Sequence, residues 1–211
     1  PGFVAGHYAR GDLDIDLVRL ARFAGSRVVV GAVHHIDTVN RQVHVPGRPP
    51  VAFDLCSIDI GITSDMPDLP GFTDHAVPAK PLGAFAQRWE RFADGSGPAN
   101  VVVIGGGVAG AELAMAMAYR LRLQGRDALV TVIEQDRPLM AIGSHARNRI
   151  LKQLQALGVK VQEQTRIAEI RNDAVILQGG STIPSDFTTG AAGARAYDWL
   201  GNCGLAMQDG F

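Results

Sequence analysis

A glycine-rich turn between a strand and a helix constrains the fold of this chain more than any other feature. Four aliphatic residues, Val101–Ile104, are followed by Gly105-Gly-Gly-Val-Ala-Gly110 and then by a run rich in alanine. The aliphatic residues predict a buried parallel strand, and the small alanines predict a helix that lies close to the sheet. A strand, a tight turn and a helix in this order predict an α/β fold with a parallel sheet.

Each glycine of this turn has a physical role if the turn binds a dinucleotide. Gly105 permits the tight turn, Gly107 lets the backbone approach a pyrophosphate, and Gly110 lets the helix and the strand pack closely. The helix begins near Val108 and directs unpaired N–H groups and the positive end of its dipole at the phosphates. The candidate binding residues are Gly105, Gly106, Gly107, Val108, Ala109 and Gly110. The alternative interpretation is a tight turn without a ligand.

An acidic residue follows the next predicted strand, Ala128–Ile133. Glu134 lies 24 residues after Gly110, where a carboxylate accepts hydrogen bonds from the ribose of an adenosine. Its charge repels a 2′-phosphate, so the sequence predicts NAD(H) rather than NADP(H), although Arg137 keeps NADP(H) open. The turn and Glu134 together predict a Rossmann-like nucleotide-binding domain.

Glu112 is a further candidate, because we expect it in the first turn of the helix that follows the glycines. Two interpretations have equal weight. The carboxylate is stabilised there by the helix dipole, or it lies beside the nicotinamide.

Two segments of the chain repeat the same order of predicted elements, Leu17–Gly61 and Ile150–Gly193. Each begins with a short amphipathic helix that ends at a glycine, and a β-branched run that predicts a strand follows. A polar turn between alternating apolar residues then predicts a β-hairpin, and an Asp followed seven residues later by Gly closes each copy. The helix-ending glycines are Gly25 and Gly158, the β-branched runs are Val28–Val30 and Val159–Val161, the hairpins are Ile36–Val45 and Ile167–Leu177, and the Asp-to-Gly segments are Asp54–Gly61 and Asp186–Gly193.

The shared order favours true repetition, with coincidence between two generic α/β segments as the alternative. A glycine-rich strand, turn and helix precede the second copy, whereas only about a dozen residues precede the first. We therefore expect the first domain to be incomplete and the chain to be a fragment. The turn-forming cluster Ala93–Pro98 is interpreted as the linker between the domains.

Composition excludes several classes of protein. A formal net charge of −1 argues against nucleic-acid binding. No apolar run approaches the ~20 residues that a membrane-spanning helix needs. Two distant cysteines and no N-terminal leader pattern predict a reduced, cytoplasmic protein.

The histidines and cysteines do not form a convincing reactive or metal site. His34 and His35 are adjacent on a predicted strand and therefore point to opposite faces, so we expect no metal site even with His44 across the hairpin. Cys56 is expected in a buried strand as a small apolar residue. Cys203 has no basic neighbour in sequence that would activate its thiol as a nucleophile.

With these motifs placed, the chain resembles the family of the pyridine nucleotide-disulfide oxidoreductases and type II NADH dehydrogenases. In that family both nucleotide domains close with an Ala-Thr-Gly-like turn near the cofactors. The second copy ends similarly at Gly190-Ala-Ala192-Gly193, which adds Ala192 and Gly193 to the candidate site. The first copy departs from the pattern, because Asp59 and Ile60 replace the usual Ala-Thr.

That departure, together with Pro1–Tyr8 and Ala79–Leu82, resembles the NADH-dehydrogenase-like group that is sometimes fused to selenide, water dikinase. The resemblance implies FAD-mediated hydride transfer from NADH to a small electron acceptor. The N-terminal glycine motif for FAD, the C-terminal Gly-Asp strand and the redox disulfide are not found in this sequence, and no side chain is assigned a catalytic role.

The resemblance implies an incomplete FAD-type domain over residues 1–97, an NAD(H)-binding domain over 98–193 with a β-hairpin crossover, and the start of a return segment over 194–211. We expect NAD(H) to bind this chain, FAD to bind only the intact protein, and the fragment to be inactive and to self-associate. Two other functions stay open, a nucleotide-sensing module without turnover and a simple NAD-dependent dehydrogenase.

Overall fold

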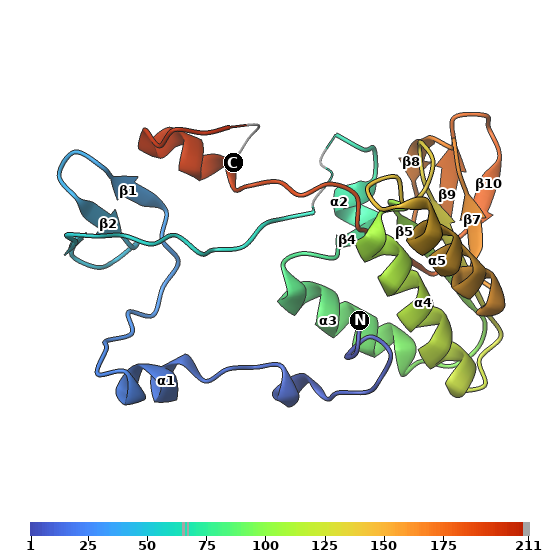
Figure 1. The fold of residues 1–211 in the computed structure, drawn as a ribbon, viewed down its shortest axis with the longest axis horizontal. Coiled ribbons are helices and arrows are strands. Elements are labelled where there is room, and N and C mark those ends of the chain that lie inside the picture. Colours follow the sequence, from blue (N-terminus) through green and yellow to red (C-terminus); the bar gives the residue numbers. More distant parts are fainter. Residues whose placement is uncertain (65, 67, 209–211) are drawn as a thin grey trace. The chain divides into compact units, whose positions relative to one another are not determined.

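The chain folds into two compact units, seen in a computed structural model that describes residues 1–64, 66 and 68–208. Unit 1 contains Pro1–Arg10 and Thr63–Ala194, and unit 2 contains Gly11–Ile62 and the chain from Arg195 onward. Residues 209–211 of the expected return segment lie outside the described residues. Figure 1 shows the elements of each unit.

A five-stranded parallel sheet forms the centre of unit 1, as the glycine turn predicts. Its strand order is β4-β11-β5-β6-β7, and every pairing is parallel. The strands are β4 (Ala76–Pro78), β5 (Ala99–Ile104), β6 (Ala128–Ile133), β7 (Lys160–Gln162) and β11 (Phe187–Gly190). The Rossmann-like α/β fold is therefore confirmed.

Different layers cover the two faces of this sheet, because successive side chains of a strand point to opposite faces. Val101 and Val103 of β5 belong to the core beneath the helices α3 (Leu82–Ala93), α4 (Val108–Leu123) and α5 (Ser144–Ala156). Val102 and Ile104 belong to a second core with α2 (Phe72–His75) and the antiparallel sheet β10-β9-β8. The strands of that sheet are β8 (Ile167–Ile170), β9 (Ala174–Leu177) and β10 (Thr182–Pro184).

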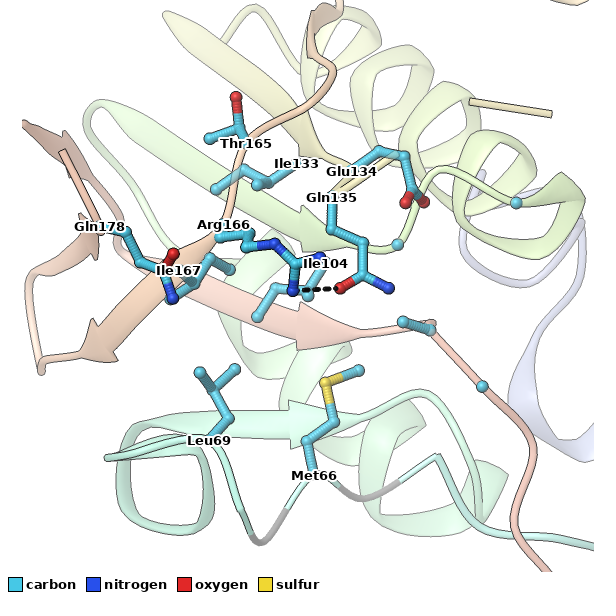
Figure 2. A pocket seen from close by; sticks show the side chains of 14 residues that line it. Met66, Leu69, Ile104, Ile133, Glu134, Gln135, Thr165, Arg166, Ile167 and Gln178 are labelled. Atoms are coloured by element: carbon cyan, nitrogen blue, oxygen red, sulfur yellow. Dashed lines mark hydrogen bonds between the residues drawn. The ribbon is translucent and has the colours of Figure 1, made fainter. Parts of the chain in front are cut away.

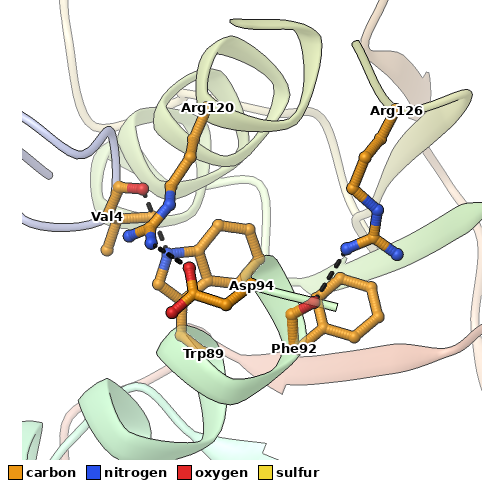
Figure 3. A network of polar contacts seen from close by, with 6 residues as sticks. All are labelled: Val4, Trp89, Phe92, Asp94, Arg120 and Arg126. Carbon is orange, nitrogen blue, oxygen red and sulfur yellow. Dashed lines mark hydrogen bonds and ion pairs between the residues drawn. The ribbon is translucent and has the colours of Figure 1, made fainter. Parts of the chain in front are cut away.

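The N-terminal segment of the chain packs against the helical layer of unit 1. Phe3, Val4 and Ala5 are buried in the same core as Trp89 of α3, whose indole Nε1 donates a hydrogen bond to the carbonyl of Val4 at 3.0 Å. Figure 3 shows this contact beside the ion pair between Arg120 and Asp94, at 2.8 Å. The same view shows Arg126, which donates to the carbonyl of Phe92 at 2.7 Å.

These contacts place the division between the units elsewhere than the expected boundary at residue 98. β4 pairs with β11 of the central sheet, and α3 buries Phe85 and Trp89 in its core. Thr63 onward, together with Pro1–Arg10, therefore belongs to the unit that contains the glycine turn. The cluster Ala93–Pro98 connects α3 to β5 inside this unit and does not link two units.

Unit 2 contains a small antiparallel sheet of order β1-β2-β3 and the helix α1 (Leu17–Phe23), whose first turn is capped by the Asp16 carboxylate. The strands are β1 (His35–Asp37), β2 (Gln42–His44) and β3 (Val51–Ala52). The 3-10 turn η1 (Arg10–Asp12) lies where the chain passes from unit 1 to unit 2, and η2 (Asp198–Cys203) follows its return to unit 2 at Arg195. The predicted helix and hairpin of the first copy are thus confirmed. The corresponding helix and hairpin of the second copy are α5 and β8–β9.

Two predicted strands of the first copy are wrong. Val28–Val30 and the residues 54–61 form no strand in the structure, and Cys56 is exposed rather than buried. The corresponding segments of the second copy, β7 and β11, are held by parallel neighbours. The described residues of unit 2 offer no parallel strand, so the backbone groups of these segments have no such partner.

Candidate functional site

The glycine turn connects β5 to α4, and each of its glycines meets a different requirement. Gly105 has a φ of +105°, a conformation that favours glycine, and a Cβ there would lie 2.7 Å from the backbone N of Ala192. A Cβ on Gly110 would collide with the carbonyl oxygen of Gly105. These two glycines are therefore required by the packing of the turn itself.

Gly107 is different, because its own packing does not require a glycine. Its φ of −70° and ψ of −177° are ordinary extended values, and a Cβ there would meet no atom within 4 Å. Gly107 caps the N-terminus of α4 without any side-chain hydrogen bond to the first turn. The open space beside Gly107 and the uncapped N–H groups of α4 together form a cradle for an anionic group.

The Glu134 carboxylate is fixed at the edge of this cradle. One oxygen accepts a hydrogen bond from the backbone N–H of Gly106 at 2.6 Å, and the other accepts from the N–H of Asp136 at 2.9 Å. Glu134 follows β6 directly and is partly buried. The structure thus brings the predicted acidic residue against the glycine turn.

A cavity of about 450 Å³ lies at the carboxyl ends of the parallel strands, in front of the glycine turn. Ligands of open α/β sheets bind at this edge. Figure 2 shows the side chains that surround the cavity. Its lining residues are Met66, Leu69, Ile104, Gly105, Gly107, Ile133, Glu134, Gln135, Thr165, Arg166, Ile167, Gln178, Ala192 and Gly193.

Most of the candidate residues from the sequence are brought together here. Five of them line the cavity: Gly105, Gly107, Glu134, Ala192 and Gly193. The others of the turn adjoin it: Gly106 donates to Glu134, Val108 and Ala109 are exposed at the start of α4, and Gly110 is buried beneath Gly105.

The expected position of Glu112 is wrong. The first turn of α4 contains no acidic residue, because the helix begins at Val108 and Glu112 falls just beyond that turn. Its side chain is exposed, and Glu112 is not among the described residues that line the cavity. Arg137 is also exposed and outside this lining.

Several lining residues were missed from the sequence. Gln135 directly follows Glu134, Thr165 and Arg166 lie between β7 and β8, and Ile167 begins β8. The rule that ligands bind beyond the carboxyl ends of parallel strands was the available signal for them. Met66 and Leu69 precede α2 and carried no such signal.

The histidine and cysteine positions do not add a second site. The rings of His35 and His44 lie 5.6 Å apart between centroids across the β1–β2 pair, and those of His34 and His44 lie 6.3 Å apart. Within the described part of the chain, no three His, Cys, Asp or Glu side chains are placed to hold a metal ion. Cys203 is buried, and its sulfur accepts a hydrogen bond from the N–H of Ile36 at 3.2 Å.

Comparison with known proteins gives one family. Residues 21–211 match the family described as pyridine nucleotide-disulphide oxidoreductase. A demethylphylloquinone reductase of Synechocystis sp. is 26% identical over 172 residues, which cover 77% of this chain and 42% of that protein. An NADH dehydrogenase-like protein of Bacillus subtilis is 24% identical over 171 residues, which cover 80% of this chain and 46% of that protein. The chain thus spans less than half the length of these two curated relatives.

Solved structures share the fold at lower identity. Reduced CoADR-RHD from Bacillus anthracis has a TM-score of 0.83 at 18% identity, covering 99% of this chain and 39% of its own. An NAD-dependent persulfide reductase from A. fulgidus has a TM-score of 0.82 at 20% identity, and the match covers 98% of this chain and 41% of that protein. A putidaredoxin reductase–putidaredoxin complex has a TM-score of 0.78 at 17% identity, and the match covers 98% of this chain and 51% of the matched chain. No helix among the described residues is long and apolar enough to cross a membrane.

Proposed function

The chain belongs to the pyridine nucleotide-disulphide oxidoreductase family, and on this premise we propose that it supplies the NADH-binding part of an FAD-dependent NADH oxidoreductase. The observation that carries the proposal is the cradle at the N-terminus of α4. There the open space beside Gly107 faces the cavity, and the Glu134 carboxylate marks its edge.

The residues of the cradle fit the pyrophosphate and ribose of NADH. Gly107, Val108 and Ala109 are exposed at the uncapped start of α4, so their N–H groups would hold the pyrophosphate. Glu134 would accept hydrogen bonds from the adenosine ribose, and its negative charge would disfavour the 2′-phosphate of NADPH. Ala192, which packs against Gly105, and the neighbouring lining residue Gly193 would form the opposite side of the site.

Membership of the pyridine nucleotide-disulphide oxidoreductase family favours a flavoprotein over a simple dehydrogenase. NADH would supply a hydride and FAD would accept it, so the protein would need only to bind and orient the two groups.

We extend the proposal to the whole protein that contains this chain. A reductase of a quinone-type compound and an NADH dehydrogenase-like protein are its curated relatives. By analogy, the acceptor would be a small molecule or a small redox protein, as in the putidaredoxin complex. A cytoplasmic location fits the two free cysteine thiols.

Equilibrium titration tests the proposal. We expect the 211-residue chain to bind one NADH per chain and to bind NADPH more weakly, as measured by calorimetry. The whole protein should be yellow and should oxidise NADH with an artificial electron acceptor. Failure of the chain to bind NADH under conditions where it is folded would contradict the proposed function.

A further inference from the structure

Arg166 is the one lining residue whose side chain carries a positive charge, among those described. It lies between β7 and β8, and its backbone is held by the N–H of Gln178, which donates to the Arg166 carbonyl at 2.9 Å. Its Nη1 donates to the amide oxygen of Gln135 at 3.4 Å, as Figure 2 shows. The two residues come from loops that follow neighbouring strands, β6 and β7, so this contact joins two loops that border the cavity.

No carboxylate of the described residues forms an ion pair with the Arg166 guanidinium. None of the ion pairs recorded for the described residues includes Arg166. Glu134, the acidic residue of the cavity, uses its two oxygens to accept the N–H groups of Gly106 and Asp136. The flat, delocalised face of the guanidinium is therefore free to meet a ligand.

The surroundings of Arg166 suit a flat ring better than a phosphate. Leu69, Ile133 and Ile167 line the same cavity with aliphatic side chains. The N–H groups that suit a phosphate belong to a different place, the start of α4 at Gly107. An arginine guanidinium stacks well on aromatic faces, because it is planar and weakly hydrated.

We propose that Arg166 is a positioning residue whose guanidinium stacks on the adenine ring of the nucleotide, held in its plane by Gln135. The inference rests on the proposed function, because it assigns the adenine end of the NADH site. It also assigns to Arg166 a role that depends on its shape and not on its charge alone.

Calorimetric titration of the full 211-residue chain with NADH, NADPH and AMP tests this assignment. The variants are Arg166→Ala, which removes the guanidinium, and Arg166→Lys, which keeps the charge but loses the plane. The matched control is Arg171→Ala, because Arg171 pairs with Glu169 in the β8–β9 hairpin and does not line the cavity. Melting temperatures show whether each variant remains folded.

We expect Arg166→Ala to weaken the binding of NADH, NADPH and AMP by a similar factor, about two- to fivefold, as for a cation–π contact of an exposed arginine. Arg166→Lys should remain weakened, and Arg171→Ala should bind as the unsubstituted chain does. Unchanged affinities in a folded Arg166→Ala variant would overturn the inference. Recovery in Arg166→Lys, with NADPH affected more than NADH, would also overturn it, because that pattern assigns Arg166 to a phosphate. If the unsubstituted chain bound none of the three nucleotides, the proposed function itself would fail, and the inference with it.

Discussion

Two glycines of the same turn should respond to substitution in opposite ways. A side chain at Gly107 enters open space, since a Cβ there meets no atom within 4 Å and its φ of −70° suits any residue. A side chain at Gly110 meets the carbonyl of Gly105, which is backbone and cannot swing away. Gly107→Val should therefore impair binding without unfolding the chain, and Gly110→Ala should impair folding.

The structure sets the size of each effect. The valine of Gly107→Val would occupy the space proposed for the pyrophosphate, so one or two charge-assisted hydrogen bonds of about 1.5–3 kcal/mol each would be lost. NADH affinity should fall at least about tenfold and up to about 10⁴-fold. The melting temperature of Gly107→Val should fall by no more than about 4 °C, because valine is a poorer N-cap for α4 than glycine by about 1 kcal/mol or less.

Gly110→Ala should lower the stability by about 1–3 kcal/mol, the usual cost of overpacking. In a chain of this size that shift lowers the melting temperature by about 2–12 °C. Differential scanning calorimetry and NADH titration of both variants separate the two effects. Full NADH affinity in folded Gly107→Val would refute the assignment of this turn to the pyrophosphate.

Three other predictions concern Glu134, Trp89 and unit 2. Glu134→Gln should raise the ratio of NADPH affinity to NADH affinity by about tenfold, since it removes a charge that opposes the 2′-phosphate. An unchanged affinity ratio in parallel titrations would show that the carboxylate does not face the ribose. Trp89→Phe should lower the free energy of unfolding by about 1–3 kcal/mol, because the buried Val4 carbonyl loses its hydrogen bond. Limited proteolysis should then cut residues 1–10 faster, and an unchanged cleavage rate would show that this bond does not hold the segment. The purified chain should lack the visible flavin band and should self-associate through exposed Leu17, Leu20 and Phe23 of α1. Phe23→Asp should reduce light scattering, and stoichiometric flavin on the chain would contradict the proposal for unit 2.

The sequence predicted the elements that carry their own local signals. β5, the glycine turn and α4 follow from an aliphatic run, three glycines at fixed spacing and a run of alanines, because strand, turn and helix each leave a mark on adjacent residues. The position of Glu134 followed from the end of β6 in the same way. The hairpin β1–β2 followed from alternation around a polar turn, whose Asp37 accepts hydrogen bonds from Asn40 that lower its pKa.

The errors concern features that depend on distant partners. Val28–Val30 has strand composition, but a central parallel strand forms only beside another parallel strand. The strand pairings of the described residues of unit 2 are all antiparallel. β4 carries too short a pattern to show that it pairs with β11, so the unit boundary was placed too late in the chain. Arg166 was overlooked because its importance comes from facing Gln135 across the cavity and not from any local motif.

Hydrogen exchange tests the central claim most directly, because it locates the nucleotide on the chain. On addition of saturating NADH, backbone amides of residues 105–110 should exchange more slowly, with further protection at 134–135 and 165–166. The β1–β2 hairpin should be unaffected. NADH binding that leaves the exchange of residues 105–110 unchanged would contradict the account.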